Sequence, residues 1–258
     1  MDTVEIMGKK IPVYGILGAI GIVLGIIYLW IVCRKNKKSV EDSLYIFIWS
    51  CLFAMIGAKL LYLLLEFRNI VCLLQQYPDK TGEIIWGYIS GGFVFYGGLF
   101  GAIVGVVISS KYFSLNPFEQ LNLCVPIMPL VHGFGRIGCN LVGCCYGIEY
   151  EGPLSRVYEH SSFAPNGVGL FPVQLVESAF DFVLFFAFII LGTKKKHKES
   201  YLYIYLVSYS IERFILEFFR GDLYRGMLLG LSTSQWISMA ILILVAVQIG
   251  AGKKKTKP

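Results

Sequence analysis

Runs of mostly apolar residues, each about 20 residues long, recur along this chain and constrain its fold more than any other feature. They cover roughly residues 12–33, 43–65, 89–109, 117–133, 172–192, 201–219 and 232–251. A helix needs about 20 such residues to cross a bilayer. Apolar side chains make up 56% of the chain and charged ones only 16%, which leaves too little polar surface for a water-soluble globule. The sequence therefore predicts an all-α integral membrane protein with about seven transmembrane helices, in a single domain over residues 1–258.

The fourth run is the least regular. It is short, and Pro126 and Pro129 interrupt it. Because proline lacks a backbone N–H group and breaks the helical hydrogen-bond pattern, this segment is either a kinked helix or a re-entrant segment. Totals of five or six spans therefore remain open.

Basic residues gather after every odd-numbered run. They are Arg34, Lys35, Lys37 and Lys38 after the first run, Lys111 after the third, Lys194, Lys195, Lys196 and Lys198 after the fifth, and Lys253, Lys254, Lys255 and Lys257 after the seventh. Since cytoplasmic loops carry the excess of lysine and arginine, this alternation predicts an extracytoplasmic N-terminus and a cytoplasmic C-terminus. The net charge of +6 thus reflects the orientation of the chain in the membrane, and no nucleic-acid partner is expected.

Three expected helices carry polar or ionisable residues along one face. The stripes are Lys59, Tyr62 and Glu66, then Gln174, Glu177 and Asp181, and finally Arg213, Glu217 and Arg220. A charged side chain within a bilayer costs about 2.5–3.5 kcal/mol and usually faces the protein interior, so the stripes predict a shared polar cavity that opens to the extracytoplasmic face. The alternative is an ion pair between Arg213 and Glu217 within one helix, with the other side chains snorkelling to the interface.

A glycine stripe follows Tyr96 in the third run. Gly97, Gly101 and Gly105 share a helical face, which permits close approach of another helix. The same bare backbone also suits a lipid head group or substrate chain lying beside Tyr96, and both explanations stay open.

The segment from His132 to Gly147 reads HGFGRIGCNLVGCCYG and follows the fourth run. Its Arg136 stands among glycines at the expected membrane surface. A guanidinium binds phosphate through two hydrogen bonds, and exposed glycine N–H groups add more, so the pattern indicates an anion site. A structural salt bridge is the competing explanation.

The ordered motifs of this chain resemble those of the prolipoprotein diacylglyceryl transferase family of bacterial inner-membrane enzymes. The matching segments are PVYG from Pro12, ED from Glu41, IGAKLLY from Ile56, GGFVFYGGLFG from Gly91, the His132–Gly147 segment, PVQLVE from Pro172, ERFILEFFR from Glu212 and LSTSQWIS from Leu231. Some positions depart from the family pattern. Lys59 replaces an arginine, Tyr96 stands where the family has histidine, and Cys139, Asn140, Val142 and Cys144 occupy the segment where the family motif continues N-F-x-N-x-E.

The resemblance implies a reaction at the outer face of the bacterial cytoplasmic membrane. A diacylglyceryl group moves from phosphatidylglycerol to the thiol of the lipobox cysteine in a preprolipoprotein, and glycerol phosphate is released. Arg136 and Arg213 would hold the donor phosphate among the membrane lipids and stabilise charge on the leaving oxygen. The residues expected to bind substrate beside them are Asn140, Gly138, Gln174, Glu177, Glu217, Arg220, Gly97, Gly98, Tyr62 and Lys59.

The acceptor thiol has an ordinary pKa of about 8.5 and needs a base or a positive field to become a thiolate. Tyr96 and His132 complete the expected catalytic set. Tyrosine, with an ordinary pKa of about 10, is a poor base, so Tyr96 is a candidate to hydrogen-bond the donor instead. His132 is either a base or a structural hydrogen-bonding group.

Cys139, Cys144 and Cys145 admit several explanations. On the oxidising side of a membrane they are candidates for a disulfide or for small buried residues. A metal site with His132, or a reactive thiol, is an alternative. Because the spacing matches none of the strong zinc patterns, neither a metal nor any other cofactor is expected.

Two other functions compete with lipoprotein modification. One keeps the phospholipid donor and changes the acceptor, as the departures at Tyr96 and at the cysteines suggest. The other is a non-enzymatic lipid-binding or transport protein that uses the same polar cavity, although we find no inverted repeat of the kind common in transporters.

Overall fold

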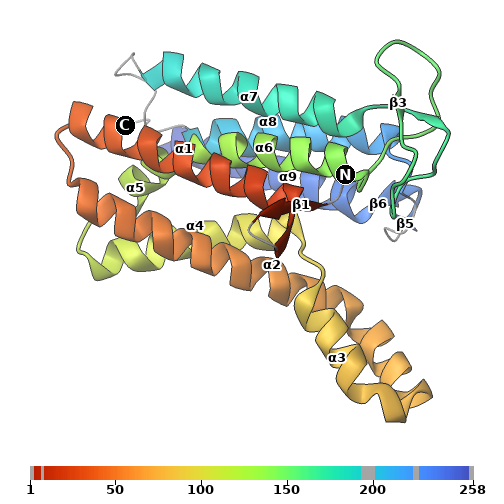
Figure 1. Cartoon of the computed structure of the whole chain (residues 1–258). Helices are drawn as coiled ribbons and strands as arrows, with labels where there is room; N and C mark the ends of the chain where they lie inside the picture. Colours follow the sequence, from red (N-terminus) through yellow and green to blue (C-terminus); the bar gives the residue numbers. More distant parts are fainter. Residues whose placement is uncertain (1–2, 7–8, 193–200, 223–226, 256–258) are drawn as a thin grey trace. The chain divides into compact units, whose positions relative to one another are not determined.

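A computed structural model describes residues 3–6, 9–192, 201–222 and 227–255. Among the basic residues used to orient the chain, Lys194, Lys195, Lys196, Lys198 and Lys257 lie outside the described residues. Within these ranges the protein is helical, apart from three two-stranded antiparallel hairpins (Figure 1). The hairpins are β1 Thr3–Ile6 with β2 Lys9–Pro12, β3 Arg156–Val157 with β4 Gly169–Leu170, and β5 Met227–Leu228 with β6 Leu231–Ser232.

Five of the described helices are long and apolar enough to cross a membrane. They are α1 Val13–Lys35, α2 Val40–Gln76, α4 Phe95–Tyr112, α7 Val173–Gly192 and α9 Thr233–Lys255. The remaining helices are η1 Pro78–Lys80, α3 Thr81–Ser90, α5 Pro117–Cys124, α6 Ile127–Val142, α8 Tyr201–Leu216 and η3 Glu217–Phe219. This confirms a helical membrane protein.

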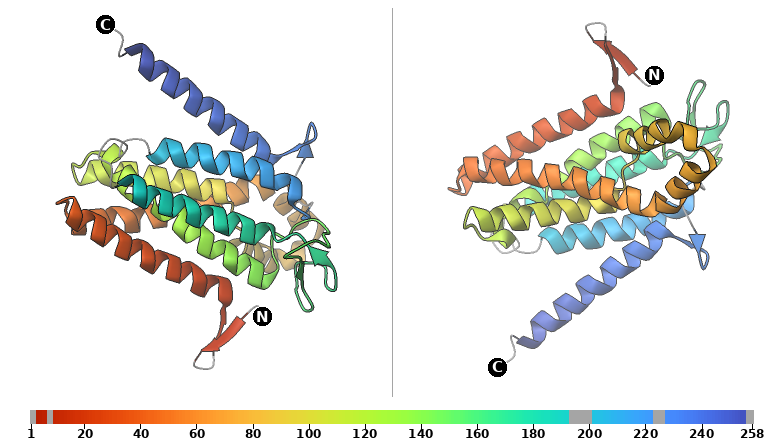
Figure 2. Two further views of the ribbon diagram at one scale, coloured as in Figure 1. Left: turned by 90° about the horizontal axis from the view of Figure 1, so that it is seen from above. Right: turned by 90° about the horizontal axis from the view of Figure 1, so that it is seen from below.

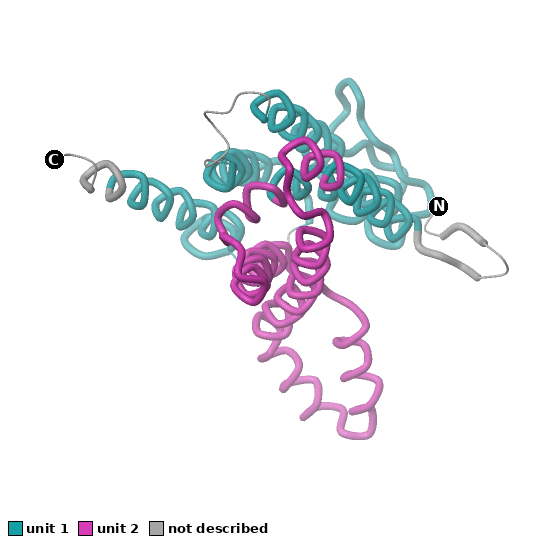
Figure 3. The backbone as a smooth tube through the Cα atoms, turned by 90° about the vertical axis from the view of Figure 1, so that its left-hand side faces the viewer, with its two compact units in different colours: residues 1–28, 125–258 teal, residues 29–124 magenta. Residues whose placement is uncertain are grey.

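The helices divide into two compact units, drawn in separate colours in Figure 3. Unit 1 comprises residues 1–28 and 125–258, and unit 2 comprises residues 29–124. The helix α1 begins in unit 1 and ends in unit 2.

In unit 2 the glycine stripe allows α2 and α4 to pack with their backbones in contact. A Cβ atom added at Gly101 would overlap the carbonyl of Phe53, and one added at Gly105 would lie 2.9 Å from the Cα atom of Ser50. Gly97 faces the carbonyl of Gly57 in the same way. Helix packing therefore explains the stripe, including Gly97, while Gly98 is in ordinary contact, its added Cβ lying 3.5 Å from that of Ala58.

Helix α2 is much longer than the span expected at 43–65. Its 37 residues extend about 55 Å at 1.5 Å per residue, against a hydrocarbon core of about 30 Å. The last turns of α2 pair with α3 and project away from the rest of unit 2 (Figure 1). A transmembrane run thus continues without a break into a helical hairpin.

Lys59 and Tyr62 hold the turn between α3 and α4. The Nζ atom of Lys59 donates to the carbonyls of Tyr88 at 2.9 Å, Gly92 at 3.2 Å and Gly91. It therefore caps carbonyls at the end of α3, as basic side chains commonly do. Tyr62 fills the space beside Gly92, whose φ of +70° suits glycine.

In unit 1, α6 packs against the first part of α1 on one side and against α7 on the other. A Cβ atom added at Gly138 would lie 2.8 Å from the Cα atom of Tyr14, and one added at Gly21 would lie 3.0 Å from that of Val131. Helices α6 and α7 run side by side, whereas α9 leaves α8 at an angle (Figure 2). Gly138, expected to bind substrate, thus contributes a close helix contact.

Candidate functional site

The first part of the His132–Gly147 segment lies within a helix. This differs from the expected arrangement, in which the segment follows the fourth span. The expected fourth span at 117–133 is replaced by α5 and α6, separated by Val125 and Pro126, as an interrupting proline explains. Helix α6 then runs through Arg136 and ends at Gly143, whose φ is +84° and whose N–H donates to the carbonyl of Cys139 at 2.9 Å. The glycines beside Arg136 therefore lie within a helix, where their N–H groups do not add to an anion site as expected from the sequence.

Arg136 is buried on the face of α6 that meets α7. Its Nη2 atom lies 2.7 Å from Oε1 of Glu177, and its Nε donates to Nε2 of His132 at 3.2 Å. The Nδ1 atom of His132 lies 2.8 Å from Oδ2 of Asp181. Glu177 and Asp181 are both fully buried on α7, so this polar stripe faces the protein interior and does not snorkel.

These contacts fit one tautomer of the neutral His132 ring. Because Arg136 donates to Nε2, that nitrogen carries a lone pair in the neutral ring, and the proton resides on Nδ1 beside Asp181. Both ring nitrogens are therefore engaged. The arrangement favours the structural explanation of His132, as a group that positions the guanidinium of Arg136.

Arg213 forms the intrahelical ion pair considered from the sequence. Its Nη2 lies 2.6 Å from Oε2 of Glu217 and donates to Oγ of Ser234 at 3.4 Å. The neighbouring residue Glu212 is also buried. Both α8 and the start of α9 therefore contribute to this region.

Arg220 does not continue the helical stripe of Arg213 and Glu217, because α8 ends at Leu216 and a 3₁₀ turn follows. It lies in extended backbone and pairs with Gly147 in an antiparallel bridge. Asp222 accepts two hydrogen bonds from its guanidinium, at 2.9 and 2.8 Å. The chain after α8 is thereby joined to the chain after α6.

Two buried cationic atoms lack a protein acceptor within the described residues, namely Nη1 of Arg213 and Nη1 of Arg220. Arg136 pairs with Glu177 of α7, and Arg213 and Arg220, which pair with Glu217 and Asp222, belong to the same unit. Buried N–H donors without partners are costly. Such a group is suited to an anion that supplies several acceptor oxygens.

Gln174 and Asn140 hold the loop that follows α6. The Nε2 atom of Gln174 donates to the carbonyl of Cys144 at 2.9 Å, and the hydroxyl of Tyr158 donates to the carbonyl of Asn140 at 2.9 Å. Burial raises the pKa of Tyr158, which keeps this hydroxyl protonated as a donor. Two residues expected to bind substrate therefore contact the same loop, Gln174 through its side chain and Asn140 through its backbone carbonyl.

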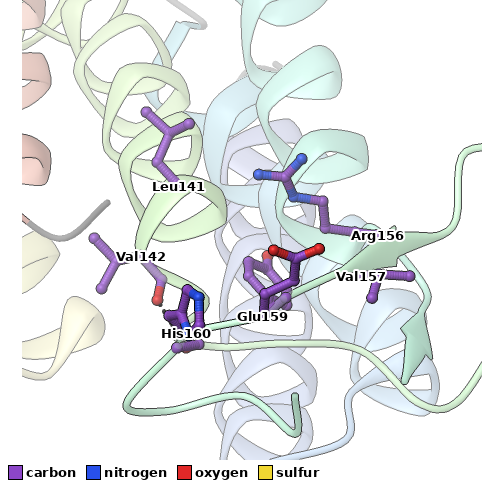
Figure 4. A pocket seen from close by; sticks show the side chains of 8 residues that line it. Leu141, Val142, Arg156, Val157, Glu159 and His160 are labelled. Carbon is purple, nitrogen blue, oxygen red and sulfur yellow. Dashed lines mark hydrogen bonds between the residues drawn. The ribbon is translucent and has the colours of Figure 1, made fainter. Parts of the chain in front are cut away.

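Two hollows border this part of unit 1. The first, of about 260 Å³, lies beside the last turn of α6 and is shown with its lining side chains in Figure 4, among them Arg156, Glu159 and His160. The second, of about 380 Å³, lies between α7 and α8. Its lining is mostly apolar and consists of Val176, Phe180, Ser208, Ile211, Glu212, Ile215 and Leu216.

The predicted site residues thus divide between the two units. The members in unit 1 are His132, Arg136, Gly138, Asn140, Gln174, Glu177, Arg213, Glu217 and Arg220. Except for Gly138, these contribute to the polar network or to its loop. The members in unit 2 are Lys59, Tyr62, Tyr96, Gly97 and Gly98. Of these, Tyr96 is buried at the start of α4.

Four polar residues join the network beyond those expected in the site. Asp181 is one of them, although its place on the polar face of α7 follows from the sequence. Glu212 and Asp222 each lie next to an arginine in the network, and acidic residues beside a membrane arginine are the signal that could have identified them. Tyr158 carries no such signal, because only the folded loop brings it to Asn140.

The chain is similar to one family of known proteins over nearly its whole length. A sequence model of the family described as prolipoprotein diacylglyceryl transferase matches residues 2–250. The chain is 37% identical over 240 residues to phosphatidylglycerol–prolipoprotein diacylglyceryl transferase 2 of Clostridium perfringens, covering 93% of this chain and 90% of that protein. It is 35% identical over 244 residues to the phosphatidylglycerol–prolipoprotein diacylglyceryl transferase of Clostridium tetani, covering 93% and 92%. The protein of the same name from Finegoldia magna is 30% identical over 262 residues, covering 100% and 98%.

Proposed function

Because this chain belongs to the prolipoprotein diacylglyceryl transferase family, we propose that it transfers diacylglyceryl from phosphatidylglycerol to the lipobox cysteine of bacterial preprolipoproteins. The acceptor thiol releases its proton, its sulfur attacks the glyceryl carbon, the bond from that carbon to the phosphate oxygen breaks, and glycerol phosphate leaves. The whole chain acts as one transferase domain.

The observation that carries this proposal is the pair of buried, unpartnered Nη1 atoms of Arg213 and Arg220 among the described residues. A phosphate oxygen placed against them would complete their hydrogen bonds. As the glyceryl–oxygen bond breaks, the phosphodiester monoanion becomes a dianionic monoester, so its attraction to guanidinium groups increases in the transition state. Arg136, oriented by Glu177 and His132, adds a third cationic group.

The remaining predicted residues have supporting roles in this scheme. Glu177 and Glu217 orient Arg136 and Arg213, while Asn140 and Gln174 hold the adjacent loop. For Tyr96 the proposed role is the one that the family resemblance implies, a hydrogen bond to the donor. For Lys59, Tyr62, Gly97, Gly98 and Gly138, the contacts within each unit support helix packing and capping instead of direct substrate contact.

The lipid chains of the donor need an apolar path beside the arginines. The hollow between α7 and α8 is mostly apolar, and Glu212 is its ionisable member. It borders the two helices that carry Glu177 and Arg213. We assign an acyl chain to this hollow, with the head group turned toward Arg213.

The same proposal includes the orientation of the chain in the bacterial cytoplasmic membrane. In addition to the five long apolar helices, α6 and α8 complete seven crossings, with the N-terminus outside and the C-terminus in the cytoplasm. Basic residues near the ends of α1 and α4 support this orientation. The loop after α6 and the segment after α8 then lie on the extracytoplasmic side. A periplasmic reporter fused after Lys255 should be inactive and a cytoplasmic one active, and the reverse result would refute this topology.

The direct test combines the purified protein with phosphatidylglycerol and a lipobox peptide. The peptide should gain the mass of one diacylglyceryl group, and a peptide with serine in place of the lipobox cysteine should gain none. Replacing phosphatidylglycerol by zwitterionic phosphatidylethanolamine should abolish the product. If an established family enzyme modifies the peptide under these conditions and this protein does not, the proposed acceptor is wrong.

Variants connect that activity to the arginines. Arg213→Ala should reduce kcat by about 10²–10³, the usual effect of removing one preorganised donor from a transition state. Arg68→Ala provides the matched control, because Arg68 is exposed on α2. Equal activity in both variants would exclude Arg213 from phosphate stabilisation.

A different acceptor is the second candidate, favoured by Tyr96 and by the altered cysteine segment. In that case a deletion strain would process its lipoproteins normally and lack a specific lipid product. Lipidomics together with lipoprotein mobility on gels separates the two acceptors.

A further inference from the structure

Three cysteine thiols converge at the end of α6. Cys139 lies in the last turn of that helix, and Gly143 ends it in a left-handed conformation. Cys145 is left-handed as well, with φ of +59°. The chain therefore reverses within a few residues, and the sulfur atoms of Cys139, Cys144 and Cys145 all lie within 4.8 Å of one another. No disulfide joins them.

Contacts from other elements hold this turn in place. The carbonyl of Cys144 accepts a hydrogen bond from Gln174 of α7, and the carbonyl of Tyr146 accepts one from the N–H of Gly221 at 3.0 Å. Gly147 bridges to Arg220. The thiols are therefore brought together by the backbone and by α7, and the site does not depend on a bond between the sulfurs.

We propose that the three thiols bind one Zn²⁺ ion, whose fourth position takes the acceptor thiol. This inference rests on the proposed function and adds the means by which the acceptor is activated. Zinc is commonly tetrahedral, with Zn–S distances of about 2.3 Å, and reactive sites keep one position open. Those distances require sulfur separations of about 3.8 Å, so the described thiols would approach by about 1 Å or less.

The charges around the cluster suit such an ion. Three thiolates and Zn²⁺ carry a net charge of −1, and two arginines come from the adjoining backbone: Arg220 bridges to Gly147, and Arg136 precedes Cys139 on α6. A hydroxide or a fourth thiolate in the remaining position brings the net charge to −2, which the same arginines offset. Cys139 also precedes Asn140 and lies one helical turn after Arg136, so a sulfur at the cluster lies near the phosphate-binding groups.

A bound metal would deprotonate the acceptor thiol, a step for which His132 has no free ring nitrogen. Both nitrogens of its ring are engaged by Arg136 and Asp181, whereas the acceptor thiol must lose its proton before it attacks. A thiol that coordinates a metal cation is deprotonated outright. The thiol proton is taken by the hydroxide in the fourth position, which leaves as water while the sulfur binds zinc. The sulfur lone pair then forms the bond to the glyceryl carbon as the carbon–oxygen bond breaks, and the electron pair of that bond stays on the departing phosphate.

The spacing C-x4-C-C gave no reason to expect a metal, since it matches none of the strong zinc patterns. Those patterns describe ligands on ordinary turns, whereas here two left-handed residues reverse the chain. The alternative metal site with His132 is not assembled, because among the described residues the three sulfurs form a group that does not include this histidine.

Cobalt provides a readout that is independent of transfer activity. Full-length protein in lipid nanodiscs, freed of metal with a chelator and loaded with Co²⁺, should bind one ion per chain and show a thiolate-to-cobalt charge-transfer band. Adding the lipobox peptide should raise the intensity of that band by about one third, because the number of sulfur ligands on cobalt rises from three to four. The serine peptide should leave it unchanged. No band, or a band that the cysteine peptide does not alter, would overturn the proposal.

Cysteine variants locate the site. Cys145→Ala and Cys139→Ala should each lower the cobalt affinity by tenfold or more, and Cys72→Ala, at an exposed position of α2, should not change it. A disulfide between any two of the three thiols, found by mass spectrometry after thiols are blocked at cell lysis, would also refute the site. The cobalt spectrum of the wild-type protein tests the metal site without any variant. Poor folding of a cysteine variant therefore would not obscure that test.

Activity assays separate this inference from the proposed function. Removing zinc should reduce transfer at least tenfold, and restoring zinc should recover it. Full transfer by the zinc-free protein would uphold the transferase and overturn the zinc site. The peptide-dependent cobalt band without transfer from any phospholipid would support the zinc site and overturn the proposed reaction.

Discussion

The Nη2 atom of Arg136 lies 2.7 Å from the Oε1 atom of Glu177, and both side chains are buried between α6 and α7. The pair joins the helix of the central motif to the helix that follows the loop. A buried pair of this kind contributes little net stability, because desolvation offsets the attraction, but breaking it leaves one charge without compensation. Its more direct consequence is to restrict the orientation of the guanidinium of Arg136.

The variant Glu177→Gln should destabilise the protein by about 3–5 kcal/mol, because it leaves the buried charge of Arg136 unpaired. Thermal unfolding in detergent measures the effect. In the double variant Glu177→Gln with Arg136→Met the charge is gone, so part of the stability should return. Additive losses in the double variant would show that the two side chains do not interact.

The variant His132→Asn tests whether His132 positions Arg136 or acts as a base. Asparagine can still accept a hydrogen bond from Arg136, so we expect kcat to fall about tenfold while the pH–rate profile keeps its shape. A catalytic base would behave differently, because its removal should abolish the acidic limb of kcat/KM. The profile of Arg136→Ala serves as the comparison, since that variant removes the partner of His132.

Replacing Tyr158 by phenylalanine should cost about 1 kcal/mol, the usual net value of a hydrogen bond, because its hydroxyl donates to the carbonyl of Asn140. Burial raises the pKa of Tyr158 above its ordinary value of about 10. The stability linked to its protonated form is therefore fully present below about pH 10 and is lost as the pH rises through the raised value. The loss above pH 10 should be smaller in Tyr158→Phe than in the wild type. Tyr112→Phe, at an exposed position, should change neither the stability at neutral pH nor its loss above pH 10.

The variant Gly101→Ala should destabilise unit 2 by about 1–3 kcal/mol, the typical cost of overpacking, because its Cβ would overlap the carbonyl of Phe53. The matched control is Gly87→Ala in α3, where an added Cβ meets nothing within 4 Å. Alanine is the better helix former by about 1 kcal/mol, so Gly87→Ala should be neutral or stabilising. Similar losses in both variants would contradict the close packing of α2 and α4.

Local periodicity determined the features of this protein that the sequence predicted well. The long apolar runs mark the helices, since the length needed to cross a bilayer is set by its thickness. The positions of Glu177 and Asp181 follow from helical spacing, because residues four apart lie on one face. Gly101 and Gly105 likewise predict a bare face suited to another helix. Each of these inferences depends only on residues within one helix.

Tertiary structure decided where the central motif lies and what surrounds it. The glycines around Arg136 lie within α6, where they let α1 and α7 pack closely against this helix. Arg220 leaves the helical stripe of Arg213 and joins Gly147 through a backbone pairing that no local pattern encodes. The thiols of Cys139, Cys144 and Cys145 meet because two left-handed residues reverse the chain and Gln174 of α7 holds the turn. Spacing along the sequence describes neighbours within an element, whereas these contacts join segments far apart in the chain and are selected only when the whole unit packs.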